Sequence, residues 1–414
     1  MTAEPRLIAD TLQTDWPPTR AEALRRIEAF APRMGRYGGM RNHDLGPDDR
    51  SNISMLSPYL RRRLATEEEA VAAALGRFAP STVEKFVQEV FWRTYFKGWL
   101  EHRPSVWTDY RLGAEQDREA VAANGGWARD LAAAEDGRTG IEPFDAWARE
   151  LTETGYLHNH ARMWFASIWI FTLRLPWRLG ARFFLRHLLD ADPASNTCSW
   201  RWVAGLHTLG KNYTARSSNI TKYTGGRFGG VHGLAADPAP LDEGPLPPRG
   251  ALRAPSRPRF DAPTALLILE DDLRLEEDLP VARAVAVATL PTTHLRDPEG
   301  ASPAAGAFEA GALQDAAARA EAAGAPAAAP LPDADALIDW AREAGADRIA
   351  TGFVPTGWAR DRLDALAPAL AKAGLTLEEN LRPWDAETWP HATAGFFKVK
   401  QKIPAILRAL GHGA

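Results

Sequence analysis

The pattern of hydrophobic and polar positions divides the chain into two unlike halves. In residues 1–235 apolar side chains recur every three or four positions, as they do on one face of a helix, and strand-like alternation is scarce. This half is therefore predicted to be predominantly helical, with clear helices over Thr82–Leu100, His160–Leu175 and Arg178–Leu189.

Residues 264–414 alternate short apolar runs with alanine-rich helical segments. We predict strands over Ala265–Leu269, Ala284–Leu290 and Arg348–Thr351, and helices over Gly311–Ala323, Ala334–Gly345 and Asp361–Gly374. Such alternation is typical of an α/β layer with a parallel sheet. Residues 236–263 are proline-rich and aperiodic, which predicts a stiff, extended linker between two domains at 1–235 and 264–414.

Composition narrows the class of protein. The only cysteine is Cys198, which excludes a disulfide framework and a cysteine-ligated zinc or iron–sulfur site. The longest apolar stretch, near Met163–Leu175, is shorter than the roughly 20 residues of a membrane span. The N-terminal string MTAEPRLIADTLQ has no apolar signal-peptide core, so we expect a cytoplasmic protein without a membrane partner.

Charge is distributed unevenly between the halves. The formal net charge of the 414 residues is -4, but residues 1–235 contain 31 Lys and Arg against 27 Asp and Glu, and the remainder contains 18 against 26. An anionic partner is therefore expected to bind the first half.

Two groups of polar residues stand out in the first 100 positions. Ser54 and Ser57 lie three apart with Pro58 next in line, which predicts a helix N-terminus that either holds a phosphate or is simply capped. Glu89, Trp92 and Arg93 share one face of an apolar helix, either as functional groups or as an ion pair beside a core tryptophan.

Two further groups follow between positions 155 and 202. Asn159, Arg162 and Met163 fall on one helix face, whereas His158 and His160 diverge by about 200° and are expected to be structural rather than metal ligands. Thirteen positions then hold two carboxylates, an amide and two indoles, which alone could be a polar loop: Asp190, Asp192, Asn196, Trp200 and Trp202. Asp190 is placed to pair with Arg162.

In their order and spacing these groups resemble the FAD-binding domain of the cryptochrome/DNA photolyase family. The matching strings are Y-x3-R, S-x-LSPYL, E-x2-WR, HN-x2-RM and D-x-D-x3-N-x3-W-x-W. The resemblance implies a helical domain that binds FAD. It implies that FAD is held by Tyr37, Ser54, Leu56, Ser57, Arg93, Arg162, Asp190, Asp192 and Asn196, with the first four at its diphosphate and Asn196 opposite flavin N5.

The resemblance also implies a light-driven lyase that splits cyclobutane pyrimidine dimers in DNA by electron transfer from reduced FAD. It implies that Arg41 contacts a DNA phosphate and that Trp200 and Trp177 conduct electrons, with Trp127 and Trp107 as candidates for a third member. The pocket for the flipped dimer would be formed by Glu89, Trp92, Asn159, Met163 and Trp202.

Several departures keep other functions open. Ile53 replaces a threonine, His160 replaces an arginine, Cys198 and Ser199 replace glycines, and residues 205–228 differ from the commonest members. A cryptochrome-type photoreceptor with a protein signalling partner, or a binding protein with a vestigial pocket, would also fit.

The second half resembles the antenna α/β domain of the same family. Leu266–Leu275 looks like the opening strand and DLR string of that domain, and Gly395–Lys402 looks like its end. The family places this domain first, so the chain is expected to be a circular permutant, unless the α/β domain is unrelated. The tryptophan and arginine usual in the opening string are absent, and the antenna chromophore is not identified.

Overall fold

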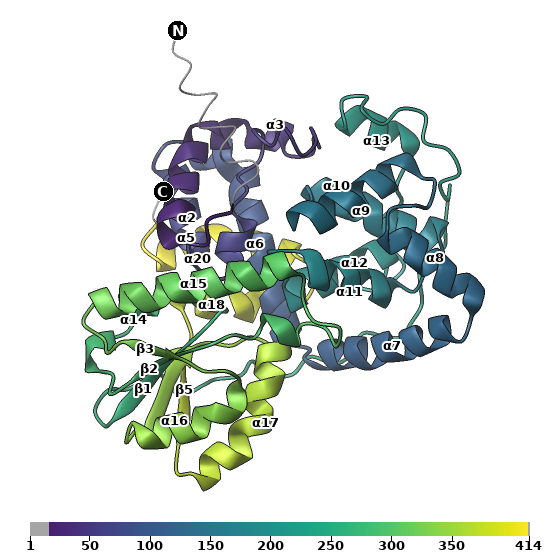
Figure 1. The fold of residues 1–414 in the computed structure, drawn as a ribbon. Coiled ribbons are helices and arrows are strands. Elements are labelled where there is room, and N and C mark those ends of the chain that lie inside the picture. The colour runs from purple at the N-terminus through teal and green to yellow at the C-terminus, as the bar shows by residue number, and fades with distance from the viewer. Residues whose placement is uncertain (1–15, 413–414) are drawn as a thin grey trace.

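In a computed structural model, which describes residues 16–412, the chain forms a helical half and an α/β half (Figure 1). The helical half confirms the prediction for residues 1–235 over its described part. Its α-helices are α2 (Arg20–Phe30), α3 (Tyr37–Met40), α4 (Ser57–Arg61), α5 (Glu67–Leu75), α6 (Pro80–Glu101), α7 (Ser105–Ala122), α8 (Gly125–Glu135), α9 (Glu142–Thr154), α10 (Asn159–Ser167), α11 (Trp177–His187), α12 (Cys198–Ala204) and α13 (Ser217–Tyr223). A 3-10 helix, η1 (Ala31–Arg36), and two π-helical turns, η2 (Ile168–Thr172) and η3 (Pro193–Thr197), connect some of them.

Helix α6 is the axis of the helical half. It begins with Pro80, whose missing N–H and fixed φ suit the first turn of a helix. Apolar side chains along most of its length are buried against α3, α5 and the turn η3. The predicted helix over Thr82–Leu100 is thus confirmed, and the polar residues on its face are held on a rigid element.

The α/β half contains a five-stranded sheet in the order β3-β2-β1-β4-β5, in which every pair is parallel. Three strands confirm predictions: β1 (Thr264–Leu269), β2 (Val287–Leu290) and β4 (Arg348–Gly352). Two edge strands were not predicted: β3 (Ala328–Pro330) and β5 (Thr376–Asn380). Helix α15 (Pro303–Ala322) lies on one face of the sheet, with α16 (Leu337–Glu343) and α17 (Trp358–Lys372) on the other (Figure 1). Short connections complete it: α14 (Leu275–Asp278), η4 (Val281–Arg283), η5 (Thr293–Leu295) and η6 (Ala334–Ala336).

The last helices return to the helical half. Helix α18 (Pro383–Thr388), the turn η7 (Trp389–His391) and α19 (Phe397–Lys400) pack on α6, and α20 (Ile403–Ala409) packs on α18. Gly98 of α6 makes room for this contact, because a Cβ there would lie 2.6 Å from Trp389 Cδ1.

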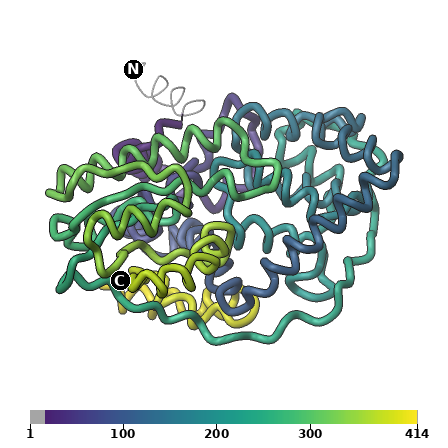
Figure 2. The backbone as a smooth tube through the Cα atoms, turned by 60° about the horizontal axis from the view of Figure 1, so that its bottom comes forward, coloured from purple at the N-terminus to yellow at the C-terminus, as the bar shows by residue number. Residues whose placement is uncertain are grey.

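Residues 236–263 cross between the halves in extended form. They contain no helix or strand and run along the lower edge of the molecule (Figure 2). Leu241 N donates to Ala204 O (2.9 Å) at one end, and Arg253 pairs with Glu379 of β5 (2.5 Å) at the other. The stretch therefore fastens the helical half to the sheet.

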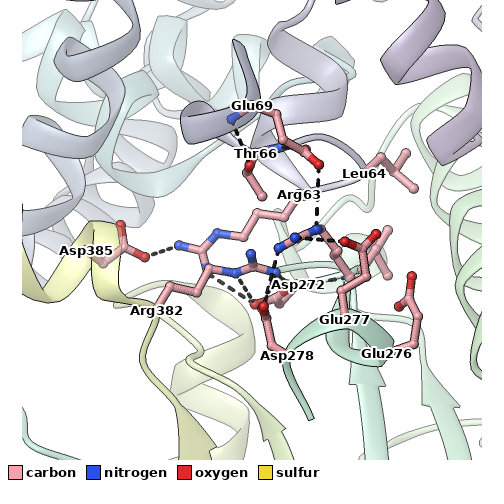
Figure 3. A network of polar contacts seen from close by, with 12 residues as sticks. Arg63, Leu64, Thr66, Glu69, Asp272, Glu276, Glu277, Asp278, Arg382 and Asp385 are labelled. Carbon is pink, nitrogen blue, oxygen red and sulfur yellow. Dashed lines mark hydrogen bonds and ion pairs between the residues drawn. The ribbon is translucent and has the colours of Figure 1, made fainter. Parts of the chain in front are cut away.

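A buried cluster of charges joins the two halves (Figure 3). Arg61, Arg62 and Arg63 end the α4 region, and Glu270, Asp271 and Asp272 follow β1 directly; all six are buried. Arg61 Nη1 lies 3.0 Å from Asp271 Oδ1, and Arg62 Nη2 lies 3.1 Å from Glu270 Oε2. The carboxyl ends of parallel strands commonly bind ligands; here they receive arginines of the helical half.

None of the helices within residues 16–412 combines the length and the apolar character needed to cross a membrane.

Candidate functional site

A cavity of about 550 Å³ lies in the helical half, and residues of α6, α10 and α12 form much of its lining. Its volume is within the roughly 300–1,000 Å³ of small-molecule and cofactor sites. Most of the predicted site residues line it, although they come from distant parts of the sequence: Tyr37, Arg41, Ser54, Leu56, Ser57, Glu89, Trp92, Arg93, Asn159, Arg162, Met163, Asp190, Asn196, Trp200 and Trp202.

An ion-pair cluster lies in the cavity wall. Arg162 Nη1 is 3.0 Å from Asp190 Oδ2, which confirms the predicted pairing, and Arg93 Nη2 is 3.7 Å from the same oxygen. Burial alone would raise the pKa of Asp190, but Arg162 and Arg93 hold it below its ordinary value. Asp190 is therefore an ionised group that orients two guanidinium groups at the cavity.

Some buried donors of the wall lack a protein acceptor. Arg93 Nη1 and Trp200 Nε1 lack hydrogen-bond partners among the described residues. Buried polar groups are nearly always paired, and an orphan donor in a cavity wall points to an acceptor supplied by a ligand. The wall can therefore donate hydrogen bonds to a ligand that carries acceptor atoms.

Asp192, which the resemblance implied would help to hold FAD, is not among the residues that line the cavity. Asp192 Oδ1 accepts from Ser195 N (2.8 Å), and Oδ2 faces Lys97 Nζ (3.6 Å) and Arg61 Nε (3.7 Å). Burial raises the pKa of Asp192, but Lys97 and Arg61 outweigh it and lower the pKa to about 2. Asp192 caps the π-helical turn η3, which in turn places Asn196 in the wall; such turns are frequent at functional sites.

Of the two tryptophans expected to conduct electrons, only Trp200 lines the cavity. Trp200 lines the cavity, and its ring centroid is 6.1 Å from that of Trp169 and 5.1 Å from that of Phe184. Trp177 is outside the cavity lining; its ring is 5.8 Å from that of Tyr110, and its Nε1 donates to Glu243 (2.9 Å).

Of the two candidates for a third member, Trp107 is the better connected. Its ring lies 5.4 Å from that of Tyr110, the neighbour of Trp177. Trp127 is 42% exposed and has no ring contact within the described part of the chain.

An ion pair between Arg41 and Glu89 forms part of the cavity lining. Arg41 Nη1 lies 2.7 Å from Glu89 Oε1, and both side chains are about three-quarters buried. Burial raises the pKa of Glu89, and Arg41 and Lys85 reverse only part of this effect. Glu89 is therefore a carboxyl group whose ionisation is sensitive to whether Arg41 stays beside it.

Aromatic contacts define the remaining wall. Trp92 stacks on Phe396 at 3.9 Å, so the C-terminal segment covers one face of this indole. Trp202 stacks on Tyr213 at 5.6 Å. His160 Nδ1 lies 2.9 Å from Asn42 O, and His160 Nε2 lies 3.0 Å from Tyr213 Oη. Both ring nitrogens are thus engaged, which agrees with a structural histidine.

The apolar residues of the cavity wall were not predicted from the sequence. The unpredicted lining residues include Met55, Phe86, Val90, Phe96, Tyr156, Leu157, Ala166, Phe184 and Val203. Apolar residues at helical spacing look like ordinary core, so no signal separated them. The polar Ser195 and Ser199 could have been chosen from their position beside Asn196.

The fold and the cavity define a helical cofactor-binding protein joined to a doubly wound α/β unit. Residues 86–225 match the family model described as the FAD binding domain of DNA photolyase. The helical half is thus similar to the FAD-binding domain of the cryptochrome/DNA photolyase family, and FAD is the cofactor of that domain.

The curated relatives match part of the chain. The deoxyribodipyrimidine photo-lyase of Streptomyces griseus is 36% identical over 174 residues, which are 41% of this chain and 36% of that protein. The photo-lyase of Agrobacterium fabrum is 31% identical over 199 residues, 46% of this chain and 39% of that protein. The chain thus spans well under half the length of these relatives. A crystal structure of a class III photolyase from Agrobacterium tumefaciens aligns over 51% of this chain and 43% of its own with 28% identity and a TM-score of 0.43.

The cavity residues fit FAD. The cofactor offers acceptor atoms on its ring edge and phosphates, which suit the orphan donors Arg93 Nη1 and Trp200 Nε1 and the hydroxyl groups of Ser54 and Ser57. Its flat ring suits a wall of aromatic and aliphatic side chains. Arg93 and Arg162 add positive charge for an anionic ligand.

Gly180 of α11 controls the shape of this wall. A Cβ at this position would lie 2.3 Å from Trp200 Cη2 and 2.9 Å from Trp169 Cε2. Replacing glycine by alanine inside a helix normally stabilises it by about 1 kcal/mol, but Gly180→Ala should push the rigid indole of Trp200 into the cavity. We expect at least about tenfold weaker FAD binding, which titration of the apoprotein followed by flavin fluorescence measures.

Gly306→Ala is the matched control for this helical glycine, because a Cβ at Gly306 in α15 would meet nothing within 4 Å. It should leave FAD affinity unchanged. Equal FAD affinity of Gly180→Ala and the wild type would show that Trp200 does not shape the flavin site.

Proposed function

We propose that the chain is a DNA photolyase that uses blue light to split cyclobutane pyrimidine dimers. The observation that carries the proposal is the convergence on one cavity of the residues assigned to FAD and those assigned to the dimer. Glu89, Trp92, Asn159, Met163 and Trp202 line the same space as Arg93, Arg162 and Asn196. A flipped lesion and a flavin would therefore share one enclosure.

FAD, when bound and reduced, would on absorbing blue light supply an electron that opens the cyclobutane ring of the dimer and then returns to the flavin, so that the overall reaction is redox-neutral. The chain would receive the dimer outside the duplex, which is least costly for a damaged and poorly stacked base pair. Trp202 and the free face of Trp92 would stack on the flipped bases. Arg41 would leave Glu89 for a backbone phosphate, an interaction that carries no sequence information.

Glu89 would then face the bases without its cation. Loss of Arg41 favours the protonated carboxyl, which can donate a hydrogen bond to a base carbonyl and stabilise negative charge there. Asn159 would supply a second polar contact from α10, and Met163 would fill the apolar space beside it. The combination of Asn159 with Met163 favours cyclobutane over (6-4) lesions as the substrate.

A cryptochrome-type photoreceptor with a protein signalling partner is the second candidate. The observation that favours it is His160, which replaces an arginine of the family and has both ring nitrogens engaged by Asn42 O and Tyr213 Oη. It is therefore not available to a DNA phosphate. We also propose that the protein acts on damaged DNA, that it is cytoplasmic, and that its chain is a circular permutant of the family.

Light-dependent repair of an oligonucleotide with one thymine dimer is the decisive experiment. Purified, photoreduced protein should restore the dimer to thymines in blue light and leave it intact in darkness. Bound and photoreducible FAD without repair would instead support the photoreceptor.

Glu89→Gln should lower the repair rate roughly 10- to 100-fold, because a charge-assisted or proton-donating contact is worth about 1.5–3 kcal/mol. FAD content should stay that of the wild type. Glu84→Gln, on the same helix but paired with Lys400 (3.4 Å), is the control and should repair normally. Normal repair by Glu89→Gln would remove Glu89 from the mechanism.

Trp200→Phe, in protein saturated with FAD to offset the lost Nε1 donor, should slow photoreduction of the bound flavin at least about tenfold, because phenylalanine is much harder to oxidise than tryptophan. The measurement is the absorbance change of the flavin under blue light with an external reductant. Trp127→Phe is the control, since Trp127 is exposed and makes no ring contact within the described residues, and it should not change the rate. An unchanged rate in Trp200→Phe would mean that the electron arrives by another route.

A further inference from the structure

One segment connects the cavity to the charged cluster between the halves. We call residues 54–63 the α4 segment. Its first residues, among them Ser54 and Ser57, line the cavity, and its last residues, Arg61 to Arg63, are buried against the α/β half. Whatever fixes the end of this segment also fixes its beginning, because the five-residue helix α4 between them is rigid over that length.

Both ends of the α4 segment have an unfavourable backbone conformation. Met55 has φ 51° and Arg63 has φ 56°, in the left-handed region that side chains other than glycine rarely adopt. Within residues 16–412 the only other non-glycine residue with positive φ is Arg174. Such conformations persist where the surrounding structure determines them, so something outside the segment must hold it.

At Arg63 the holding groups are two carboxylates from the second half of the chain (Figure 3). Arg63 Nη1 lies 3.4 Å from Asp272 Oδ2, and Arg63 Nη2 pairs closely with Asp385 of α18. Arg382 donates from Nε to Asp272 Oδ2 (2.8 Å), which fixes this carboxylate in turn. Leu273 N also donates to Arg62 O (3.0 Å), so backbone and side chains are joined.

The neighbouring arginines hold the opposite wall of the cavity. Arg61 Nε donates to Ala191 O (2.8 Å), and Arg62 Nη1 donates to Leu189 O (2.5 Å). These two carbonyl groups flank Asp190, whose side chain orients Arg162 and Arg93. Asp271 and Glu270 compensate the charges of Arg61 and Arg62 from the end of β1.

We propose that Asp272 and Asp385 are positioning residues for FAD: the α/β half holds the α4 segment in its strained conformation and so shapes the part of the cavity that receives the cofactor's diphosphate. The carboxyl end of β1 thereby acts as a scaffold for a ligand bound in the other half of the molecule. The inference rests on the proposed placement of the diphosphate at Ser54 and Ser57.

The test compares FAD with riboflavin, which lacks the diphosphate and the adenosine. Asp385→Asn keeps the size of the side chain but removes the charge that faces Arg63. In the full-length apoprotein it should weaken FAD binding about tenfold and riboflavin binding less than about threefold. Arg63→Lys keeps the charge but loses the guanidinium geometry. It should also weaken FAD binding more than riboflavin binding, by a smaller factor than Asp385→Asn. This variant replaces Asp385→Asn in the test if the latter does not fold.

Asp297→Asn is the matched control. Asp297 forms an equally buried ion pair across the same two halves, with Arg182 Nε at 2.6 Å, but contacts no residue of the α4 segment. It should lower the unfolding temperature like Asp385→Asn while leaving the FAD-to-riboflavin affinity ratio at the wild-type value.

The outcomes separate the two hypotheses. An unchanged ratio in both Asp385→Asn and Arg63→Lys, or the same change of ratio in Asp297→Asn, would overturn the positioning role. Ser57→Ala tests the diphosphate placement: normal FAD affinity in this variant would contradict the placement, while a lowered FAD-to-riboflavin ratio in Asp385→Asn would still support the positioning role.

Discussion

The three consecutive arginines that the helical half buries are the constraint on which the two-part architecture depends. Arg61, Arg62 and Arg63 are each at most 2% exposed. A buried charge without a partner is strongly unfavourable, and the helical half does not by itself supply enough carboxylates. The α/β half supplies them at one strand end, where Glu270 also accepts hydrogen bonds from Thr292, Thr293 and Trp358.

Although burial alone would raise the pKa of Glu270, the neighbouring guanidinium groups of Arg296, Arg61 and Arg62 hold this pKa far below its ordinary value. Its contribution to stability is therefore present above the ordinary pKa of a glutamate and is lost only on strong acidification.

This requirement explains why the usual ligand edge of the sheet contains protein. In an open α/β sheet the crevice at the carboxyl ends of the strands is the preferred place for a cofactor. Here arginine side chains and the N-terminal turn of α17 fill that region, and the cofactor cavity is entirely within the helical half. The two halves thus divide the tasks of binding and support. The division also accounts for the return of the C-terminal helices to α6, since Asp385 reaches Arg63 from α18.

The sequence predicts those features that local pattern determines. The apolar runs identified β1, β2 and β4, and the helical periodicity identified α6, α10 and α11. Strand β5 escaped notice because its glutamates are buried: Glu378 and Glu379 pair with Arg259 and Arg253 of the extended linker. Strand β3 is a three-residue, largely exposed edge strand within an alanine-rich region. Most of the motif residues do meet in the cavity, but Asp192 and Trp177 do not, because their orientation depends on Lys97, Arg61 and Glu243, which are distant in the sequence.

The long separation between the partners of the charged cluster has a consequence for synthesis. Arg63 and Asp272 are 209 positions apart, and Arg63 and Asp385 are 322 apart. At about 5–20 residues per second, a ribosome needs roughly 10–40 s to make the first of these carboxylates after the arginine. During that interval the helical half carries uncompensated guanidinium groups at sites that are dry in the finished protein. The nascent chain is then an intermediate that must keep this surface hydrated or shielded, and flavin capture would follow completion of the α/β half rather than precede it.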